Sequence, residues 1–298
     1  MLNVLIALLP VVAWGTWLAP SQTVRFPSQQ TKTLYVTGAN LAITSVIVLF
    51  QGIDALLGLP ASAFWLIFLG GVIWSVSSLF AFTATDNIGT ARAFGLWAPI
   101  NIVVSLVWGI LLFGEFLGTD LRILLSLTGS LVLVIGGVLL IIFSKGTARL
   151  DAADKKAVRL GYLGAVGAGI LWASYFIPIQ FAGVSMWVGA FPMALGMFAA
   201  SIVLVGITRK SVRLDGGRDV ARTLLSGALW TAGNFGMLLM VDRFGTGRGF
   251  TITQLSVVVN ALVGIFVLKD PAPKSRAALL TFVGCVIATA GAILLGNL

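Results

Sequence analysis

The stretch WGTWLAPSQ (residues 14–22) returns 158 residues later as WASYFIPIQ (172–180), with the leading Trp, a second aromatic residue, the Pro and the final Gln all in place. Other echoes follow in the same order at offsets of 156 and 155: Trp74 with Trp230, TATDNIGTARAF (83–94) with LMVDRFGTGRGF (239–250), and GILLFGE (109–115) with GIFVLKD (264–270). Collinear matches with so little drift indicate that the chain contains an internal duplication.

The composition places this duplicated chain in a membrane. Of its 298 residues, 58% are hydrophobic and 10% are charged, whereas a soluble domain carries about 25% charged residues. Its apolar residues form runs of about 20, the length that a helix needs to cross a ~30 Å hydrocarbon layer. Backbone groups in lipid need internal partners, so we predict a helix for each of ten runs: 3–20, 34–53, 61–83, 93–113, 121–143, 161–180, 185–207, 223–241, 249–268 and 277–296.

Each copy contains five runs, and an odd number of crossings turns the second copy upside down in the membrane. We therefore predict an all-α polytopic membrane protein with ten transmembrane helices in two inverted five-helix repeats, residues 1–144 and 161–298. Residues 145–160 form a cytoplasmic basic linker between them. Secondary transporters of this architecture bind substrate near mid-membrane between the repeats. The fifth and tenth runs hold few polar residues and are read as peripheral helices or as the face of a homodimer.

The net charge of +9 is unevenly distributed. Sixteen of the 19 basic residues fall in alternate loops, 21–33, 84–92, 144–160, 208–222 and 269–276. Positive charge marks cytoplasmic loops, so we predict a multi-pass protein of the plasma membrane with both termini outside. The basic loops then face anionic lipid headgroups of the bilayer, and the pattern argues against nucleic-acid binding.

Enzyme chemistry has no visible basis in the sequence. The chain has no His and a single Cys, Cys285, and it lacks a Walker A loop. No nucleophile–base pair or cluster of metal ligands is visible, so we predict no catalytic residue, no metal site and no cofactor. No acid lies clearly at mid-span, so the sequence leaves open both a proton gradient as driving force and facilitated diffusion.

Polar and aromatic residues inside the runs are the candidates for substrate binding. Amides in hydrocarbon are costly and face the bundle interior, and because they donate and accept they suit hydroxyl-rich ligands. Flat Trp faces can cover the C–H face of a sugar. The candidates are Asn101, Asn234, Gln254, Asn260, the duplicated Trp14, Trp74, Trp172 and Trp230, and Thr16, which matches Ser174. The alternatives are helix–helix hydrogen bonds for the amides, worth about 0.6 kcal/mol each, and plain packing for the Trp residues.

Two further duplicated patterns suggest gates. Asp86 with Arg92, and Asp242 with Arg248, are six residues apart around a glycine. The simpler interpretation is that each Asp caps a helix and pairs with its Arg across a tight turn; the other is a latch that breaks and forms as access alternates. Gln22 and Gln180 follow Pro20 and Pro178 on what would be opposite sides of the membrane. They are gate candidates too, unless both are helix ends kept for packing.

Three segments carry a family resemblance: ALLPVVAWGT (7–16), APIN with its later GE (98–115), and FTITQLSVVVNALVGIFVL (250–268) with the terminal AILLGNL. Over essentially its whole length the chain resembles the glucose/ribose uptake (GRP) family of the drug/metabolite transporter superfamily. The resemblance implies a ten-helix carrier of small sugars in the plasma membrane, and polar family positions fall on Asn101, Asn234 and Gln254. The chain departs from the family pattern at Asp86, Arg92, Asp242 and Arg248, and an Arg could meet an anionic ligand.

Together these patterns predict a secondary transporter that moves a small neutral sugar or polyol by alternating access. An exporter of metabolites or drugs from the same superfamily, acting on an amine, an amino acid or a nucleoside, is the alternative. A membrane sensor or scaffold without turnover is a third reading, which the inverted repeats and buried amides disfavour.

Overall fold

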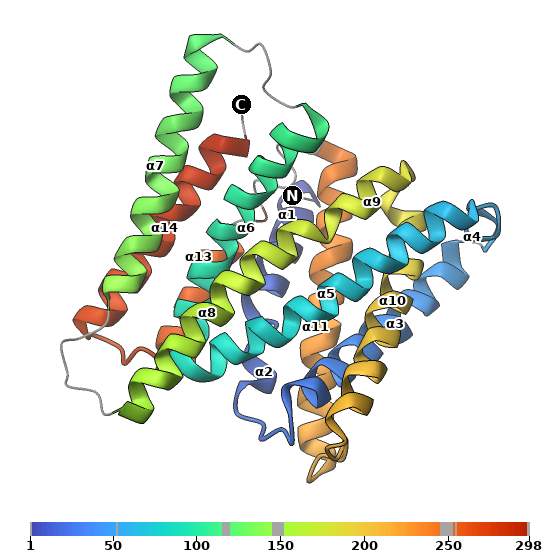
Figure 1. Ribbon diagram of the computed structural model, residues 1–298, viewed down its shortest axis with the longest axis horizontal. Coiled ribbons are helices and arrows are strands. Elements are labelled where there is room, and N and C mark those ends of the chain that lie inside the picture. The colour runs from blue at the N-terminus through green and yellow to red at the C-terminus, as the bar shows by residue number, and fades with distance from the viewer. Residues whose placement is uncertain are drawn as a thin grey trace.

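All the secondary structure of the described residues is helical (Figure 1). The structure is a computed structural model and describes residues 2–51, 53–114, 120–144, 152–244, 253 and 255–296. The helices are α1 (Leu2–Thr16), α2 (Ala19–Gln22), α3 (Gln29–Gln51), α4 (Asp54–Leu57), α5 (Ala61–Ile88), α6 (Thr90–Phe113), α7 (Leu121–Phe143), α8 (Ala152–Ser174), α9 (Phe176–Ala182), α10 (Met186–Thr208), α11 (Gly217–Phe244), α13 (Ser256–Leu262), the π-helix η1 (Val263–Val267) and α14 (Arg276–Gly296).

The prediction of an all-helical, multi-pass membrane chain is confirmed. Within the described ranges, seven helices are long and apolar enough to cross a membrane: α3, α5, α6, α7, α8 with α9, α10 and α14. The three other predicted runs are also helical where described, as α1 with α2, α11, and α13 with η1. Several boundaries differ from the prediction: α3 begins at Gln29, α5 extends to Ile88 and α11 begins at Gly217. The largest difference is in α8, which begins at Ala152 and includes residues expected to belong to the linker.

The duplicated stretch breaks its helix in both copies. We expected the first and sixth runs to be single helices with a late proline, but α1 ends at Thr16 before α2 begins, and α8 ends at Ser174 before α9 begins. Proline lacks the N–H that would bond to the carbonyl four residues earlier, which is the carbonyl of Thr16 for Pro20 and of Ser174 for Pro178. Trp17 and Tyr175 therefore lie at the two breaks. Pro99, by contrast, lies inside the unbroken α6.

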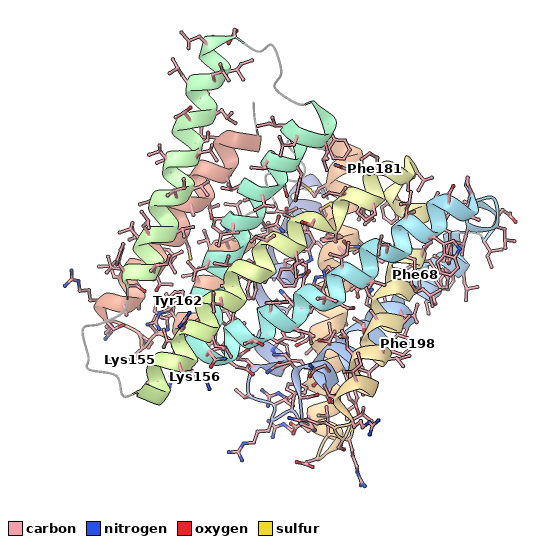
Figure 2. All side chains as sticks on the ribbon, in the orientation of Figure 1. Phe68, Lys155, Lys156, Tyr162, Phe181 and Phe198 are labelled. Atoms are coloured by element: carbon pink, nitrogen blue, oxygen red, sulfur yellow. The ribbon has the colours of Figure 1, made fainter. Side chains whose placement is uncertain are left out.

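Helices of the two halves interleave (Figure 1). α5 packs on α8 and α10, while α11 packs on α1 and α3. Likewise, α6 packs on α8, and α13 packs on α1. α7 and α14 lie side by side at one flank of the bundle (Figure 1). Along α8 and α9, Lys155 and Lys156 lie at one end of the bundle and Phe181 lies towards the other (Figure 2).

Glycines bring α5 and α10 into backbone contact. A Cβ placed on Gly71 would lie 2.1 Å from the carbonyl oxygen of Met193, and one on Gly196 would lie 2.1 Å from the carbonyl oxygen of Phe68. Neither carbonyl belongs to a flexible side chain that could move aside. Small residues at such contacts let helices in lipid approach closely, and this contact joins the two halves of the chain.

We expect Gly196→Ala to destabilise the protein, because the added methyl group meets backbone, and overpacking typically costs about 1–3 kcal/mol. Gly206→Ala is the matched control, since Gly206 lies in the same helix with open space around it. The measurement is the melting temperature of the purified protein in detergent. Equal melting temperatures for the two variants would contradict the close contact.

Candidate functional site

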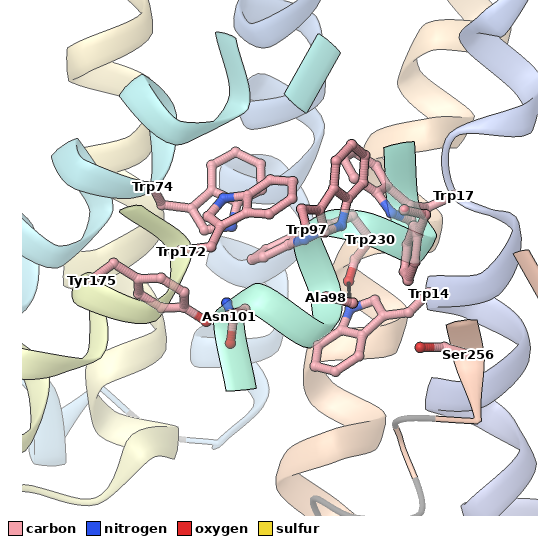
Figure 3. Close-up of a pocket in the computed structure, with 11 residues that line it drawn as sticks. Trp14, Trp17, Trp74, Trp97, Ala98, Asn101, Trp172, Tyr175, Trp230 and Ser256 are labelled. Atoms are coloured by element: carbon pink, nitrogen blue, oxygen red, sulfur yellow. Dashed lines mark hydrogen bonds between the residues drawn. The ribbon is translucent and has the colours of Figure 1, made fainter. Parts of the chain in front are cut away.

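An aromatic cavity lies at the centre of the bundle (Figure 3). Its volume is about 110 Å³, on a measure by which one water needs roughly 10–15 Å³, so several waters or one small ligand could occupy it. Both halves of the chain contribute to its walls: Trp14, Trp17, Trp74, Phe94, Trp97, Ala98 and Asn101 from the first, and Trp172, Tyr175, Trp230 and Ser256 from the second.

The four duplicated Trp residues meet here. The ring of Trp74 lies edge-on to that of Trp230 with centroids 4.6 Å apart, and its centroid is 5.9 Å from that of Trp172. The indole Nε1 of Trp14 donates a hydrogen bond to the backbone oxygen of Trp230 at 3.2 Å. The structure thus brings together all four Trp residues that sequence reasoning proposed, and their role in substrate binding stays a prediction.

Trp172 differs from its copy Trp14 in one respect. Trp172 is 8% exposed, and its ring packs against Trp97, Trp74 and Trp17. Its indole Nε1 is buried without a hydrogen-bond partner. A buried donor left unpaired costs about 1–3 kcal/mol, and an acceptor brought into the cavity by a ligand could recover that cost.

Several lining residues escaped the sequence analysis. Trp17 and Tyr175 occupy the same place in the duplicated stretch, which is a signal that could have identified both as site residues. The offset of 155 that aligns residues 109–115 with 264–270 also pairs Asn101 with Ser256, and both line the cavity. Trp97 carries no comparable signal, because its place in the cavity depends on how α6 is rotated.

The candidate amides go to different places. Asn101 lies on the cavity wall, and its Oδ1 accepts a weak hydrogen bond from Ser105 Oγ at 3.5 Å. Asn234 lines a second, smaller cavity of about 20 Å³ that shares Tyr175 with the first. Asn260 is buried and donates to the backbone oxygen of Gly15 at 3.1 Å, which is the helix–helix bond named as the alternative. Gln254 lies outside the described residues.

Thr16 is not among the residues that line the central cavity. Its hydroxyl donates to the backbone oxygen of Val12 at 2.7 Å, one turn earlier in α1. Ser174, its copy, does the same to Ile170 at 2.8 Å and also accepts from the indole of Trp108 at 3.1 Å. Both hydroxyls therefore bond to the backbone of their own helix in its last turn before the break.

The expected pairing of Asp86 with Arg92 is wrong. Gly89 has a positive φ of 81° and separates α5 from α6, so the two side chains point to different neighbours. Asp86 accepts a hydrogen bond from the Gln29 amide, and its charge acts on Lys32. Arg92 acts instead on Asp270, whose carboxylate lies over Gly89. Partial burial raises the pKa of Asp270, and the Arg92 charge opposes that rise.

The other gate candidates are not equivalent. Gln22 donates from Nε2 to the backbone oxygen of Thr85 at 3.2 Å, whereas Gln180 is exposed on α9. Asp242 lies in α11, but its side chain is outside the described part of the chain, as is all of Arg248. Lys32, which the charge pattern placed in a cytoplasmic loop, lies in the first turn of α3 and is 1% exposed.

Comparisons with known proteins agree with this picture. The family model described as "Sugar transport protein" matches residues 5–298. A "Putative sugar uptake protein" of Listeria innocua is 29% identical, over 99% of this chain and 98% of its own length. The "Glucose uptake protein GlcU" of Bacillus subtilis is 24% identical, over 99% of this chain and 98% of its own. A protein of known crystal structure has the same fold, with a TM-score of 0.66 and 21% identity over 99% of this chain and 97% of its own.

We expect Gln22→Ala to lower stability and Gln180→Ala to leave it unchanged, although the two residues match in the duplicated stretch. Gln22 loses a part-buried hydrogen bond to α5, worth about 1 kcal/mol, whereas the side chain of Gln180 is exposed. The measurement is the melting temperature of each variant in detergent, with uptake measured alongside. Equal effects in both variants would mean that the duplicated Gln residues play one shared role after all.

Proposed function

We propose that this chain, which belongs to the sugar transport protein family, carries a small neutral sugar or similar polyol across the plasma membrane by alternating access. The family membership confirms the resemblance read from the sequence. The chain is a sugar transport protein and not an enzyme. The identity of the sugar, the route and the mechanism form the proposal.

The observation that carries the proposal is the chemistry of the central cavity. The described side chains that line it are aromatic rings, one amide, the hydroxyls of Ser256 and Tyr175, and one methyl group, with no charged residue among them. Aromatic faces suit the C–H faces of a pyranose ring, and Asn101 offers both a donor and an acceptor to its hydroxyls. A charged substrate would find no counter-charge among these described lining residues.

The proposed mechanism needs two halves that can exchange roles. We take these to be inverted five-helix repeats, residues 1–144 and 161–298, joined by the linker 145–160, which makes ten crossings. Helix packing supports the assignment, because α5 on α8 and α10 has its counterpart in α11 on α1 and α3. The cavity also takes three matched pairs from the echoes: Trp14 with Trp172, Trp17 with Tyr175, and Trp74 with Trp230.

The proposed orientation keeps both termini outside. In this orientation the basic loops face the cytoplasm, as the positive-inside pattern requires. Lys155 and Lys156 lie at the end of α8 that this orientation puts inside (Figure 2). Lys32 and Asp86 then lie towards the cytoplasm, and the short connection between α9 and α10 lies outside.

Export of an organic cation is the second candidate function. The observation that favours it is the ring cluster, since Trp faces attract cations. The lack of any acid among the described lining residues disfavours it, because a desolvated cation needs a counter-charge more than a sugar does.

The test is uptake of labelled monosaccharides into proteoliposomes, with and without a pH gradient. We expect saturable uptake of at least one neutral monosaccharide, competed by the unlabelled sugar. Stimulation by an inward proton gradient would indicate coupling, and its absence would indicate facilitated diffusion. Transport of an amine, an amino acid or a nucleoside without any sugar transport or competition would overturn the assignment.

Trp14→Phe should mainly affect stability, whereas Trp172→Phe should mainly affect the KM for the sugar. Both keep an aromatic ring, but Trp14→Phe removes an internal hydrogen bond and should lower stability by about 1 kcal/mol. Trp172→Phe removes a donor that has no partner in the protein. We expect it to leave stability nearly unchanged and to raise the KM for the sugar by about 3–10-fold, the value of one neutral hydrogen bond.

The measurements for this pair are the melting temperature and the KM of uptake for each variant. Deoxy analogues sharpen the result, because the KM penalty of Trp172→Phe should vanish for the analogue that lacks the hydroxyl receiving the bond. A KM penalty that is the same for every analogue would leave Trp172 as a packing residue.

A further inference from the structure

Lys32 is an unusual cation for its position. It lies in the first turn of α3 and is 1% exposed, among the largest fully buried side chains. Lysine is almost never fully buried unless it is paired. Its Nζ lies 4.4 Å from the ring centroid of Phe82 and 5.4 Å from that of Phe26, and the charge of the exposed Asp86 acts on it.

Two aromatic rings connect the central cavity to the ammonium group of Lys32. Trp17 lines the cavity and packs against Phe82, with ring centroids 5.9 Å apart. The ammonium group of Lys32 in turn lies over the ring of Phe82. At the outer edge the Gln29 amide holds the Asp86 carboxylate, and Gln22 bonds to the Thr85 backbone. These contacts run from Trp17 on the cavity wall to the exposed Asp86.

The position that matches Lys32 in the second half of the chain holds no cation. α3 and α10 are both 23 residues long and begin 157 residues apart, and the echo in the preceding stretch has an offset of 158. Either offset pairs Lys32 with a small residue, Gly189 or Ala190, and both of these line the second cavity. The matches of Trp17 and Phe82, which are Tyr175 and Leu238, line it as well.

We infer that Lys32 is a positioning residue of transport: its ammonium group, held on Phe82 by the charge of Asp86, closes one mouth of the central cavity, and the other mouth, without a matching cation, is closed by the Tyr175 ring. This inference rests on the proposed function and names the two mouths through which the sugar passes. In the proposed orientation the Lys32 mouth is cytoplasmic.

The asymmetry follows from the cost of moving a charge. To open the Lys32 mouth, the first turn of α3 must withdraw a cation from an aromatic face and from its counter-charge, and water must then hydrate it. To open the other mouth, only the neutral Tyr175 ring must move, and the second cavity already lies beside it. In the conformation described here, more groups must therefore move to open the Lys32 mouth than to open the Tyr175 mouth.

Matched cysteines can report on the two mouths. Cys285 is the single Cys and is buried, so Cys285→Ala gives a cysteine-free background. Ser78 is fully buried on α5 between Trp74 and Phe82, and its match in the duplication, Asn234, lines the second cavity on α11. The measurement is the rate of alkylation of Ser78→Cys and of Asn234→Cys by N-ethylmaleimide in the purified full-length protein.

We expect Asn234→Cys to react at least tenfold faster than Ser78→Cys. Adding Lys32→Met should raise the rate at Ser78→Cys about tenfold or more and leave that at Asn234→Cys unchanged. The double change Lys32→Met with Asp86→Asn removes both charges, so neither is left uncompensated, and should have the same effect. Lys155→Met, which removes an exposed positive charge, should change neither rate.

Two results would overturn the inference. One is an unchanged rate at Ser78→Cys in a double variant that elutes as a folded protein on size exclusion. The other is an equal rise at both cysteines, which would mean general loosening. Alkylation needs no sugar, so a protein that labels as expected but transports no sugar would refute the proposed function alone. A sugar transporter with the wrong labelling pattern would refute the inference alone.

Discussion

The packing of Trp74 between Trp172 and Trp230 is the interaction on which the rest of the structure depends. These rings come from α5, α8 and α11, and their centroids lie 5.9 and 4.6 Å from that of Trp74. In lipid there is no hydrophobic force to press helices together, so close packing and hydrogen bonds must hold them. The ring cluster does this at the centre of the bundle, and glycine contacts such as that of Gly71 with α10 do it further out. The rings meet tilted or edge-on and line the central cavity.

The broken helices beside the cavity are the second constraint, and they follow from the first duplicated stretch. A break in lipid leaves backbone groups that need partners. One such group, the carbonyl of Gly15 in the last turn of α1, accepts a hydrogen bond from Asn260 of α13. The hydroxyls of Thr16 and Ser174 bond one turn back to carbonyls of their own helices. The same breaks turn Trp17 and Tyr175 towards the cavity. Polar side chains that sequence reasoning assigned to substrate thus serve the protein's own backbone, and aromatic residues that it passed over form the wall.

The candidate site was predictable to the extent that duplication marks it. The four matched Trp residues and Asn101 were proposed from sequence and lie on the cavity. Phe94 matches Phe250 in one of the echoes, so the duplication could have marked it as well. Trp97 could not be found, since the helical rotation that brings it inward depends on how α6 packs on α8 and α13. Asp86 and Arg92 suggested a pair because they are close in the chain, but the glycine between them sends them apart, to Lys32 and to Asp270. The charge pattern also placed Lys32 in a loop, whereas the residue is buried.

The sequence by itself determined that this chain is a helical membrane protein, that several of its segments recur in the same order, and which family it resembles. Hydropathy, run length and collinear echoes are local or pairwise properties of the chain, and they survive without knowledge of the packing. The tertiary structure decided which residues face the cavity, which amides bond to the backbone, and that Lys32 is buried. Those outcomes depend on helix rotation and on contacts between segments far apart in the chain. The two copies also differ there, because small residues in one stand where a buried cation stands in the other.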